Sequence, residues 1–162
     1  MTKRETLNVR LERFYAEARK AGLRITPQRL AIFKLVAGSV SHPGAEEIHR
    51  QLRRSFPMIS LDTVYRTLWK LADLGLVSAL GQERIQLRFD ANQNRHQHFT
   101  CKRCGLIRDF TNARLSALGI PSEAAQFGQA EDLRVEVRGV CSACLRKKAP
   151  GEGKNNRSKP KT

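Results

Sequence analysis

The four cysteines of this 162-residue sequence form two CxxC pairs. Cys101 and Cys104 make the first pair, Cys141 and Cys144 make the second, and 36 residues lie between the pairs. A CxxC turn places both sulfur atoms on one side of the backbone, so two such turns can surround Zn²⁺ with four thiolates. Two disulfides or a thioredoxin-like redox pair would use the same residues. Because thiols stay reduced in the cytosol and no βαβ pattern is present, the spacing favours a structural zinc site.

Histidine and aspartate side chains cluster around the first CxxC pair, at Asp90, His96, His98 and Asp109. On a strand, residues two apart point to the same face, so His96 and His98 would lie side by side. Imidazole nitrogen and carboxylate oxygen together suit Fe²⁺, Mn²⁺ or Zn²⁺ rather than a soft metal. Such side chains are also common on polar surfaces without any ion. The pattern therefore indicates a second metal site but leaves a solvated surface cluster as the alternative.

The formal net charge is +15, and it is unevenly distributed along the chain. Residues 1–89 hold sixteen basic and eight acidic side chains, residues 90–144 hold seven and six, and residues 145–162 hold seven and one. A basic surface attracts polyanions, usually nucleic acid, with an anionic membrane as the competitor. No apolar stretch approaches the roughly 20 residues that span a bilayer, and the N-terminus lacks a signal peptide. We expect a cytoplasmic protein that binds a polyanion and does not enter a membrane.

These shifts in charge divide the sequence into two domains and a tail. The first domain covers residues 1–89, the second covers residues 90–145, and the basic tail covers residues 146–162. The Gly, Asn, Ser and Lys content of the tail predicts disorder. The second domain is too small to bury a large core, so zinc binding and dimerisation would both help it to fold.

Hydrophobic periodicity predicts helices followed by a hairpin in the first domain. Thr26 and Pro27 are a good start signal for a helix, with threonine as the N-cap and proline at the first helical position. The four predicted helices cover residues 7–21, 27–37, 45–56 and 61–74. Two strands are predicted at 77–80 and 84–89, where polar and apolar side chains alternate in the second. This order predicts a winged helix, in which the start of the fourth helix enters the major groove of DNA.

The apolar stripe of the fourth helix predicts which of its side chains face outward. With the stripe placed inward, the outward residues are Asp62, Thr63, Arg66, Trp69 and Lys70, with Tyr65 at the margin. An ordinary helix with a solvated polar face would show the same pattern. Because Tyr65 and Arg66 lie near the helix start in a basic segment, we favour DNA contact.

The second domain is predicted to contain strands at 106–110 and 133–140, which flank the zinc clamp, and a short helix within 114–127. The predicted fold class is therefore α+β. It combines an N-terminal winged helix, made of a helix-turn-helix and a β-hairpin wing, with a C-terminal α/β dimerisation domain that carries the Cys₄ zinc site.

The longest motif, from Arg95 to Gly105 with Asp109 and Phe110 after it, resembles the signature of the ferric uptake regulator (Fur) family. Three further segments resemble that family in the same order along the chain, namely Thr26-Pro27-Gln28-Arg29, His42-Pro43 and Ile59–Leu68. The resemblance covers about residues 7–145. It implies a homodimeric bacterial repressor that binds pseudo-palindromic operators in double-stranded DNA when it is metallated.

Within the family, the sequence is most similar to the peroxide-sensing branch (PerR). The resemblance implies one regulatory Fe²⁺ or Mn²⁺ site with the ligands His42, Asp90, His96, His98 and Asp109. Iron-sensing members usually have further histidines where this sequence has Arg95 and Gln97, and glutamate where it has Asp90 and Asp109. The implied signal is H₂O₂, which oxidises a ligand histidine when Fe²⁺ is bound. The resemblance also adds Arg24, as a minor-groove residue, to the DNA-binding candidates Thr63, Tyr65 and Arg66.

Three alternatives remain. The first is a Fur-type repressor that senses the iron level. The second is a non-haem iron enzyme built on two histidines and a carboxylate, although nothing in the sequence indicates a substrate pocket, and we expect no enzyme activity. The third is a zinc-ribbon RNA-binding protein that uses the basic tail, which would bind in a salt-dependent and sequence-independent way.

Overall fold

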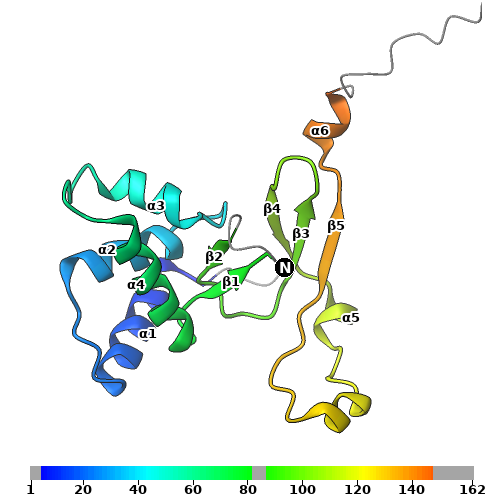
Figure 1. Cartoon of the computed structure of the whole chain (residues 1–162). Helices are drawn as coiled ribbons and strands as arrows, with labels where there is room; N and C mark the ends of the chain where they lie inside the picture. The colour runs from blue at the N-terminus through cyan, green and yellow to red at the C-terminus, as the bar shows by residue number, and fades with distance from the viewer. Residues whose placement is uncertain (1–4, 82–86, 148–162) are drawn as a thin grey trace, which may run out of the picture.

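The computed structural model describes residues 5–81 and 87–147. Figure 1 shows two lobes, which we name the helical lobe and the sheet lobe. The helical lobe contains α1 (Leu7–Lys20), α2 (Pro27–Ala37), α3 (Ala45–Leu52), α4 (Leu61–Asp73), β1 (Ser78–Leu80) and β2 (Arg88–Asp90). The sheet lobe contains β3 (Gln97–Cys101), β4 (Ile107–Phe110), α5 (Ala113–Ser116), the 3₁₀-helix η2 (Ser122–Phe127), β5 (Glu136–Gly139) and α6 (Ser142–Arg146).

Side-chain caps begin three of the four helices in the helical lobe. The hydroxyls of Thr6, Thr26 and Ser60 accept hydrogen bonds from backbone N–H groups in the first turns of α1, α2 and α4. The start signals predicted at Thr26 and Ser60 are thus confirmed. The third helix was predicted to continue to Phe56, and this is wrong. It ends at Leu52, whose carbonyl accepts hydrogen bonds from the N–H groups of both Ser55 and Phe56 and so turns the chain.

The core of the helical lobe is formed by apolar side chains from all four helices and from β2. Phe14 of α1 stacks on Phe33 of α2, with their ring centroids 4.7 Å apart. On α4, the predicted inward residues Val64, Leu68 and Leu71 are fully buried. This burial leaves the opposite face of α4 outward, as the periodicity predicted.

Strands β1 and β2 pair in antiparallel register next to the four helices, with Ala79 opposite Phe89. Four helices followed by such a pair is the order of elements predicted for a winged helix. The middle of the predicted hairpin, residues 82–86, lies outside the described residues. The indole of Trp69 on α4 packs edge-on against Phe89, with their ring centroids 6.1 Å apart.

The sheet lobe is built on a three-stranded sheet with the order β4-β3-β5. β3 is antiparallel to β4 and parallel to β5, which runs along the outer edge in Figure 1. The strands predicted at 106–110 and 133–140 are present but shorter. The predicted short helix within 114–127 appears as two pieces, α5 and η2. The division into two domains and a tail stays a prediction, and residues 148–162 of the tail lie outside the described part.

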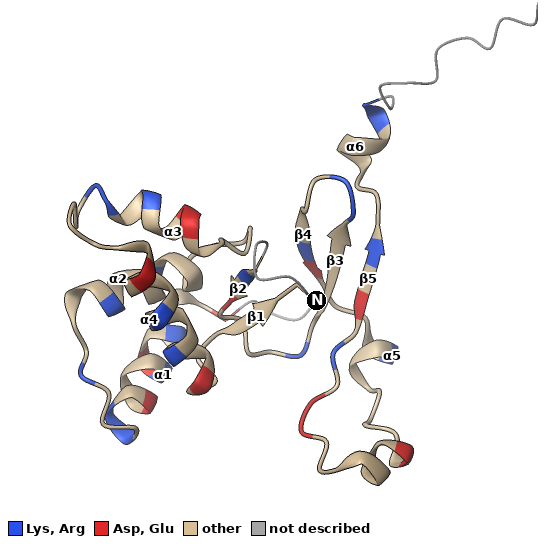
Figure 2. Cartoon of the chain, in the orientation of Figure 1, with Lys and Arg blue, Asp and Glu red and all other residues tan. Residues whose placement is uncertain are grey.

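Lys and Arg residues are numerous in the helical lobe, for example at the end of α1 and on α4 (Figure 2). The described helices are all too short or too polar to span a lipid bilayer.

Candidate metal centres

The four cysteines meet in one cluster at the end of the sheet lobe. Cys101 ends β3, Cys104 follows in the next turn, Cys141 caps α6 and Cys144 lies within α6. Their sulfur atoms all lie within 4.8 Å of one another. Gly105 allows the tight turn because its φ of 68° is in the left-handed region, which side chains disfavour.

The electrostatics of this cluster fit a bound cation. The backbone N–H of Cys141 donates to the sulfur of Cys101 at 3.3 Å and lowers the pKa of that thiol to about 6. The neighbouring sulfurs of Cys104 and Cys141 raise the pKa of Cys144 to about 12. Four thiols at this spacing therefore do not all ionise by themselves, whereas Zn²⁺ binds four thiolates in a tetrahedron. The cluster has the composition and spacing of a structural zinc site.

A second cluster lies where the two lobes meet, and it contains all five residues that the family resemblance implied. His42 and Asp90 come from the helical lobe, while His96, His98 and Asp109 come from the sheet lobe. The Nε2 atom of His42 lies 2.8 Å from Oδ1 of Asp109, and that of His96 lies 3.0 Å from Oδ2 of Asp90. The Nε2 atoms of His96 and His98 are 2.9 Å apart.

Local structure in each lobe positions these side chains. In the sheet lobe, His98 of β3 and Asp109 of β4 are cross-strand partners in the antiparallel ladder, so they share a face. Asp90 is the last residue of β2. His42 is 3% exposed and lies in the loop before α3. Two overlapping groups of ligand atoms share His98, one with His42 and Asp109 and the other with Asp90 and His96.

Hydrogen bonds outside the cluster orient two of its members. The Nδ1 atom of His96 donates to the carbonyl of Asn94 at 2.6 Å, which leaves Nε2 to face the cluster. The N–H of Asn92 donates to Oδ1 of Asp90 at 2.8 Å, which leaves Oδ2 to face His96. The Nδ1 atom of His42 is buried and has no hydrogen-bond partner among the described residues.

The charges of this second cluster are mutually stabilising. Burial opposes ionisation of Asp90, but hydrogen bonds with His96 and His98 outweigh it and hold the pKa of the carboxyl below its usual range. Burial likewise opposes protonation of His96, but the hydrogen bond to Asp90 leaves the pKa of His96 raised. Neighbouring ligands bound at about 2.1 Å to one ion lie roughly 3 Å apart. The three short contacts, from 2.8 to 3.0 Å, match that spacing.

Two residues where the family resemblance would lead one to expect histidines in an iron sensor have other partners here. The side chain of Gln97 is buried, accepts a hydrogen bond from the N–H of Asn112 and donates to the hydroxyl of Ser116. Arg95 donates to the carbonyl of Ser116 at 2.6 Å. Both side chains therefore tie β3 and its preceding loop to α5.

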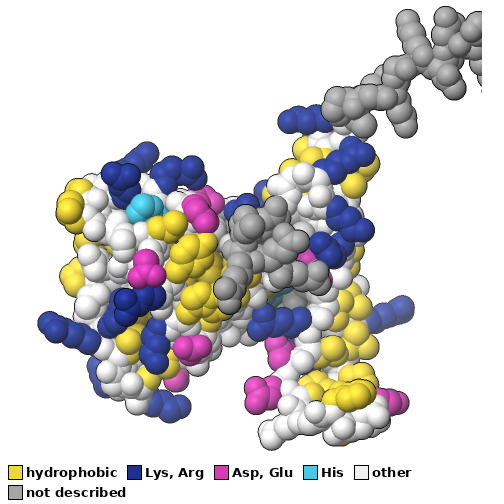
Figure 3. Space-filling view, viewed as in Figure 1, with side chains coloured by type: hydrophobic (Ala, Val, Ile, Leu, Met, Phe, Trp, Pro, Cys, Tyr) yellow, Lys and Arg dark blue, Asp and Glu magenta, His cyan; other side chains and the backbone are white. Residues whose placement is uncertain are grey.

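The predicted DNA-binding residues fall into two places. Arg24, Thr63 and Arg66 line one groove between the α1–α2 loop and α4. The groove is further lined by Arg29 and Lys70, among others. Lys and Arg side chains gather over α4 and the end of α1 in the space-filling view (Figure 3).

Tyr65 does not line this groove. Its hydroxyl donates to Oε1 of Glu46 on α3 at 2.7 Å, and this bond lowers the pKa of Glu46 and raises that of Tyr65. Neither Glu46, as the partner of Tyr65, nor Arg29, as a groove residue, was predicted from the sequence. Arg29 lies within the motif that begins at Thr26, whereas no local pattern relates Glu46 to Tyr65.

Comparison with known proteins agrees with these observations. The sequence model of the ferric uptake regulator family matches residues 20–137. The peroxide-responsive repressor PerR of Staphylococcus epidermidis is 39% identical over 140 residues, which cover 86% of this chain and 93% of that protein. PerR of Staphylococcus aureus (strain Mu50) is 37% identical, with 86% and 95% covered.

Solved structures show the same fold. The Helicobacter pylori ferric uptake regulator Fur matches with a TM-score of 0.71 and 25% identity, over 92% of this chain and 100% of that one. The Campylobacter jejuni peroxide stress regulator matches with a TM-score of 0.61 and 28% identity, over 83% and 98%. These relatives are transcriptional regulators, which confirms the expectation that the chain is not an enzyme. The chain belongs to the ferric uptake regulator family.

Proposed function

We propose that this protein is a metal-dependent repressor that binds double-stranded DNA as a homodimer and releases it when H₂O₂ oxidises its regulatory site. The observation that carries the proposal is the convergence of three imidazoles and two carboxylates from both lobes. Their nitrogen and oxygen donors suit Fe²⁺ or Mn²⁺. An ion bound by all five residues ties the helical lobe to the sheet lobe.

This connection explains how metal can control DNA binding. A repressor dimer reads two half-sites only when its two DNA-binding parts have the correct separation and orientation. Without the ion, conformers with that orientation are a minor fraction, and the apparent affinity for DNA falls in proportion to the fraction. The ligands His42, Asp90, His96, His98 and Asp109 would thus set the population of the DNA-binding state.

Peroxide is the signal that the sequence and its relatives favour. Relatives at 37–39% identity are named peroxide-responsive repressors, and both carboxylates of the cluster are aspartates. Fe²⁺ held by these five residues would supply the redox chemistry by which H₂O₂, the two-electron oxidant, adds one of its oxygen atoms to a neighbouring imidazole and releases the other as water. His42 and His96 are the proposed targets, by resemblance to the family. An oxidised ring is a poorer ligand, so the lobes separate and DNA is released.

The proposed DNA contacts are Arg24, Thr63, Tyr65 and Arg66. The groove beside α4 supports the first, second and fourth of these, because its further basic residues would neutralise backbone phosphates. Tyr65 would reach a thymine methyl from the neighbouring side of the helix.

Zn²⁺ held by Cys101, Cys104, Cys141 and Cys144 would stabilise the sheet lobe. In the stretch of chain that leads from β4 to β5, that lobe exposes the apolar side chains of Leu118, Ile120 and Phe127, the last 86% exposed. Figure 3 shows hydrophobic side chains gathered at this end of the lobe. Contiguous apolar surface of this kind is typical of protein interfaces, and the proposed interface is with a second copy of the chain.

We place this repressor in the cytoplasm, where its thiols stay reduced.

The proposal is tested in two steps with the zinc-loaded protein. In a mobility-shift assay with the chain's own promoter DNA, addition of Mn²⁺ or Fe²⁺ should produce the complex. Treatment with H₂O₂ should then dissociate the Fe²⁺ complex and leave the Mn²⁺ complex intact. Mass spectrometry should find one added oxygen on peptides that contain His42 or His96. If these peptides stay unmodified and DNA binding persists, the peroxide response is wrong, and iron-level sensing becomes the better account.

A further inference from the structure

The backbone of His42 adopts a conformation that needs support. Its φ is 52°, and among the described residues it is the only one other than glycine with a positive φ. Side chains disfavour this left-handed region, and the ring of Pro43 further restricts the residue before it. A loop free to relax would therefore leave this conformation and turn the imidazole away from Asp109, which it now contacts at 2.8 Å.

Strand β2 lies directly against this loop. The N–H of Phe89 donates to the carbonyl of Pro43 at 3.1 Å. The Nη1 atom of Arg88 donates to the carbonyl of His42 itself, at 3.5 Å. The loop approaches so closely that a Cβ built on Gly44 would lie 3.2 Å from the carbonyl oxygen of Leu87. The His42 backbone is thus held from one side, by the strand that ends in Asp90.

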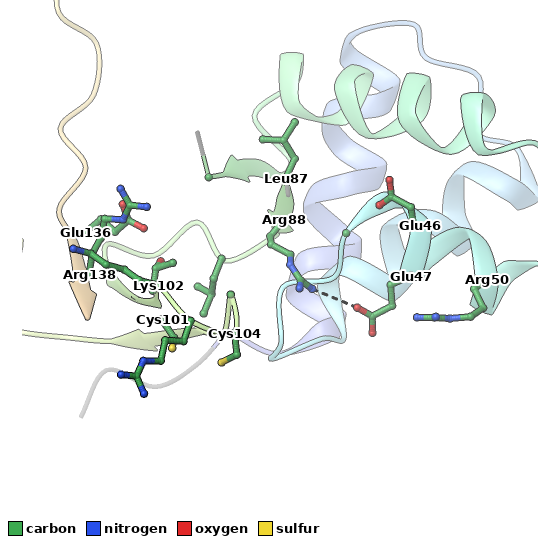
Figure 4. A pocket seen from close by; sticks show the side chains of 16 residues that line it. Glu46, Glu47, Arg50, Leu87, Arg88, Cys101, Lys102, Cys104, Glu136 and Arg138 are labelled. Atoms are coloured by element: carbon green, nitrogen blue, oxygen red, sulfur yellow. Dashed lines mark ion pairs between the residues drawn. The ribbon is translucent and has the colours of Figure 1, made fainter. Parts of the chain in front are cut away.

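The guanidinium of Arg88 is itself held in place. It forms an ion pair with Glu47 in the first turn of α3, at 3.6 Å, as the dashed line in Figure 4 shows. Both side chains are only about one third exposed, at 35% and 34%. They lie at the side of a cleft of about 710 Å³ between the lobes, which the turn at Cys101–Cys104 lines from the other lobe. Arg88 therefore connects β2, α3 and the His42 carbonyl.

We propose that Arg88 is a positioning residue for the regulatory metal site. It holds the carbonyl of His42, so that the imidazole already points into the cluster before an ion binds. This inference rests on the proposed function, because it takes His42 to be a metal ligand. Arg88 acts through the backbone of His42, since none of its described hydrogen bonds or ion pairs is with a side chain of the cluster.

The direction in which Mn²⁺ affinity changes when Arg88 is replaced separates positioning from simple electrostatics. Replacing Arg88 by methionine removes a positive charge near a cation site, and on charge alone this would strengthen Mn²⁺ binding. Loss of positioning has the opposite effect, because the apparent affinity falls with the fraction of molecules in which His42 is aligned. We expect Arg88→Met to weaken Mn²⁺ binding about fivefold to tenfold, which corresponds to an aligned fraction of roughly 10–20%.

The experiment measures the Mn²⁺ affinity of the zinc-loaded full chain in the absence of DNA. Mn²⁺ is titrated into the protein, and binding is monitored by calorimetry or by electron paramagnetic resonance. Arg88→Lys should recover part of the affinity, and Glu47→Gln should cause a smaller loss than Arg88→Met. Arg50→Met is the matched control, because Arg50 lines the same cleft (Figure 4) and forms no described ion pair. Zinc content and the thermal midpoint, measured on every variant, should stay close to those of the parent.

A double-mutant cycle with His42→Ala decides between the possible outcomes. If Arg88 acts through His42, then Arg88→Met should cause no further loss of affinity in the His42→Ala background. An equal loss in both backgrounds, or unchanged binding by Arg88→Met alone, would overturn the inference. If His42→Ala alone binds Mn²⁺ as tightly as the parent, the proposed ligand set is wrong. That result can be distinguished from a failure of the Arg88 inference, because it is obtained with Arg88 intact.

Discussion

Arg66 offers the most direct test of the DNA contacts proposed for the helical lobe. Its side chain is 82% exposed, and its ion pair is with Asp62 one turn earlier on α4, at 3.7 Å. Exposed pairs at this spacing contribute about 0.3–0.5 kcal/mol to folding. Arg66→Ala should therefore leave the free energy of unfolding almost unchanged, and any loss of DNA affinity belongs to the interface.

The expected loss of affinity can be worked from the dimer. A good contact between arginine and a base contributes about 1–3 kcal/mol, or roughly fivefold to 150-fold in Kd. The proposed homodimer on a two-half-site operator would lose this contact twice, so even the lower value corresponds to about 30-fold if the sites are additive. Loss of a phosphate contact alone would instead lower the salt dependence without changing sequence preference.

The assay is fluorescence anisotropy with Mn²⁺-loaded protein, on operator DNA and on operators changed one base pair at a time. Arg54→Ala is the control, because it removes the same charge at a residue that is exposed but does not line the groove. The docking of α4 in the major groove would be refuted if Arg66→Ala behaved like Arg54→Ala in both affinity and base preference.

Four further results are expected. Cys101→Ser should lose the zinc and the dimer, as elemental analysis and light scattering would show, and zinc-free protein that stays dimeric would contradict the structural site. Asp109→Glu should keep Mn²⁺-dependent DNA binding but reduce the yield of oxidised histidine after H₂O₂, which peptide mass spectrometry measures against the parent. Tyr65→Phe should raise the pKa of Glu46 towards its ordinary value, because the hydrogen bond from Tyr65 is the main cause of its lowering, and a carboxyl-detected NMR titration checks this. Truncation after Leu145 should weaken binding to all DNA sequences alike and flatten its salt dependence, because the tail is basic.

Features that depend on neighbouring residues were predictable from the sequence. The caps at Thr26 and Ser60 and the buried stripe of α4 follow from patterns within one turn or one helix. Each CxxC pair likewise brings its own two sulfurs together. The early end of α3 was missed, because the competing turn at Leu52 uses the same backbone groups that a longer helix would use.

Contacts between distant segments were not predictable from local patterns. Composition alone suggested only four of the five residues in the second cluster, and His42 was added by resemblance to the family. Nothing within the loop around His42 indicates that it meets Asp109, because that contact depends on how the lobes pack. The pairs formed by Glu46 with Tyr65 and by Glu47 with Arg88 are of the same kind.

The second cluster combines two parts that are built separately. In the sheet lobe, cross-strand pairing already places His98 beside Asp109. In the helical lobe, the hydrogen bond between Phe89 and Pro43 holds the loop of His42 beside the strand that ends in Asp90. Because each part is shaped by its own backbone, an ion bound as we propose would need little of its binding free energy to order the ligands. Most of that free energy would then fix the orientation of the lobes, on which DNA binding depends in the proposed function.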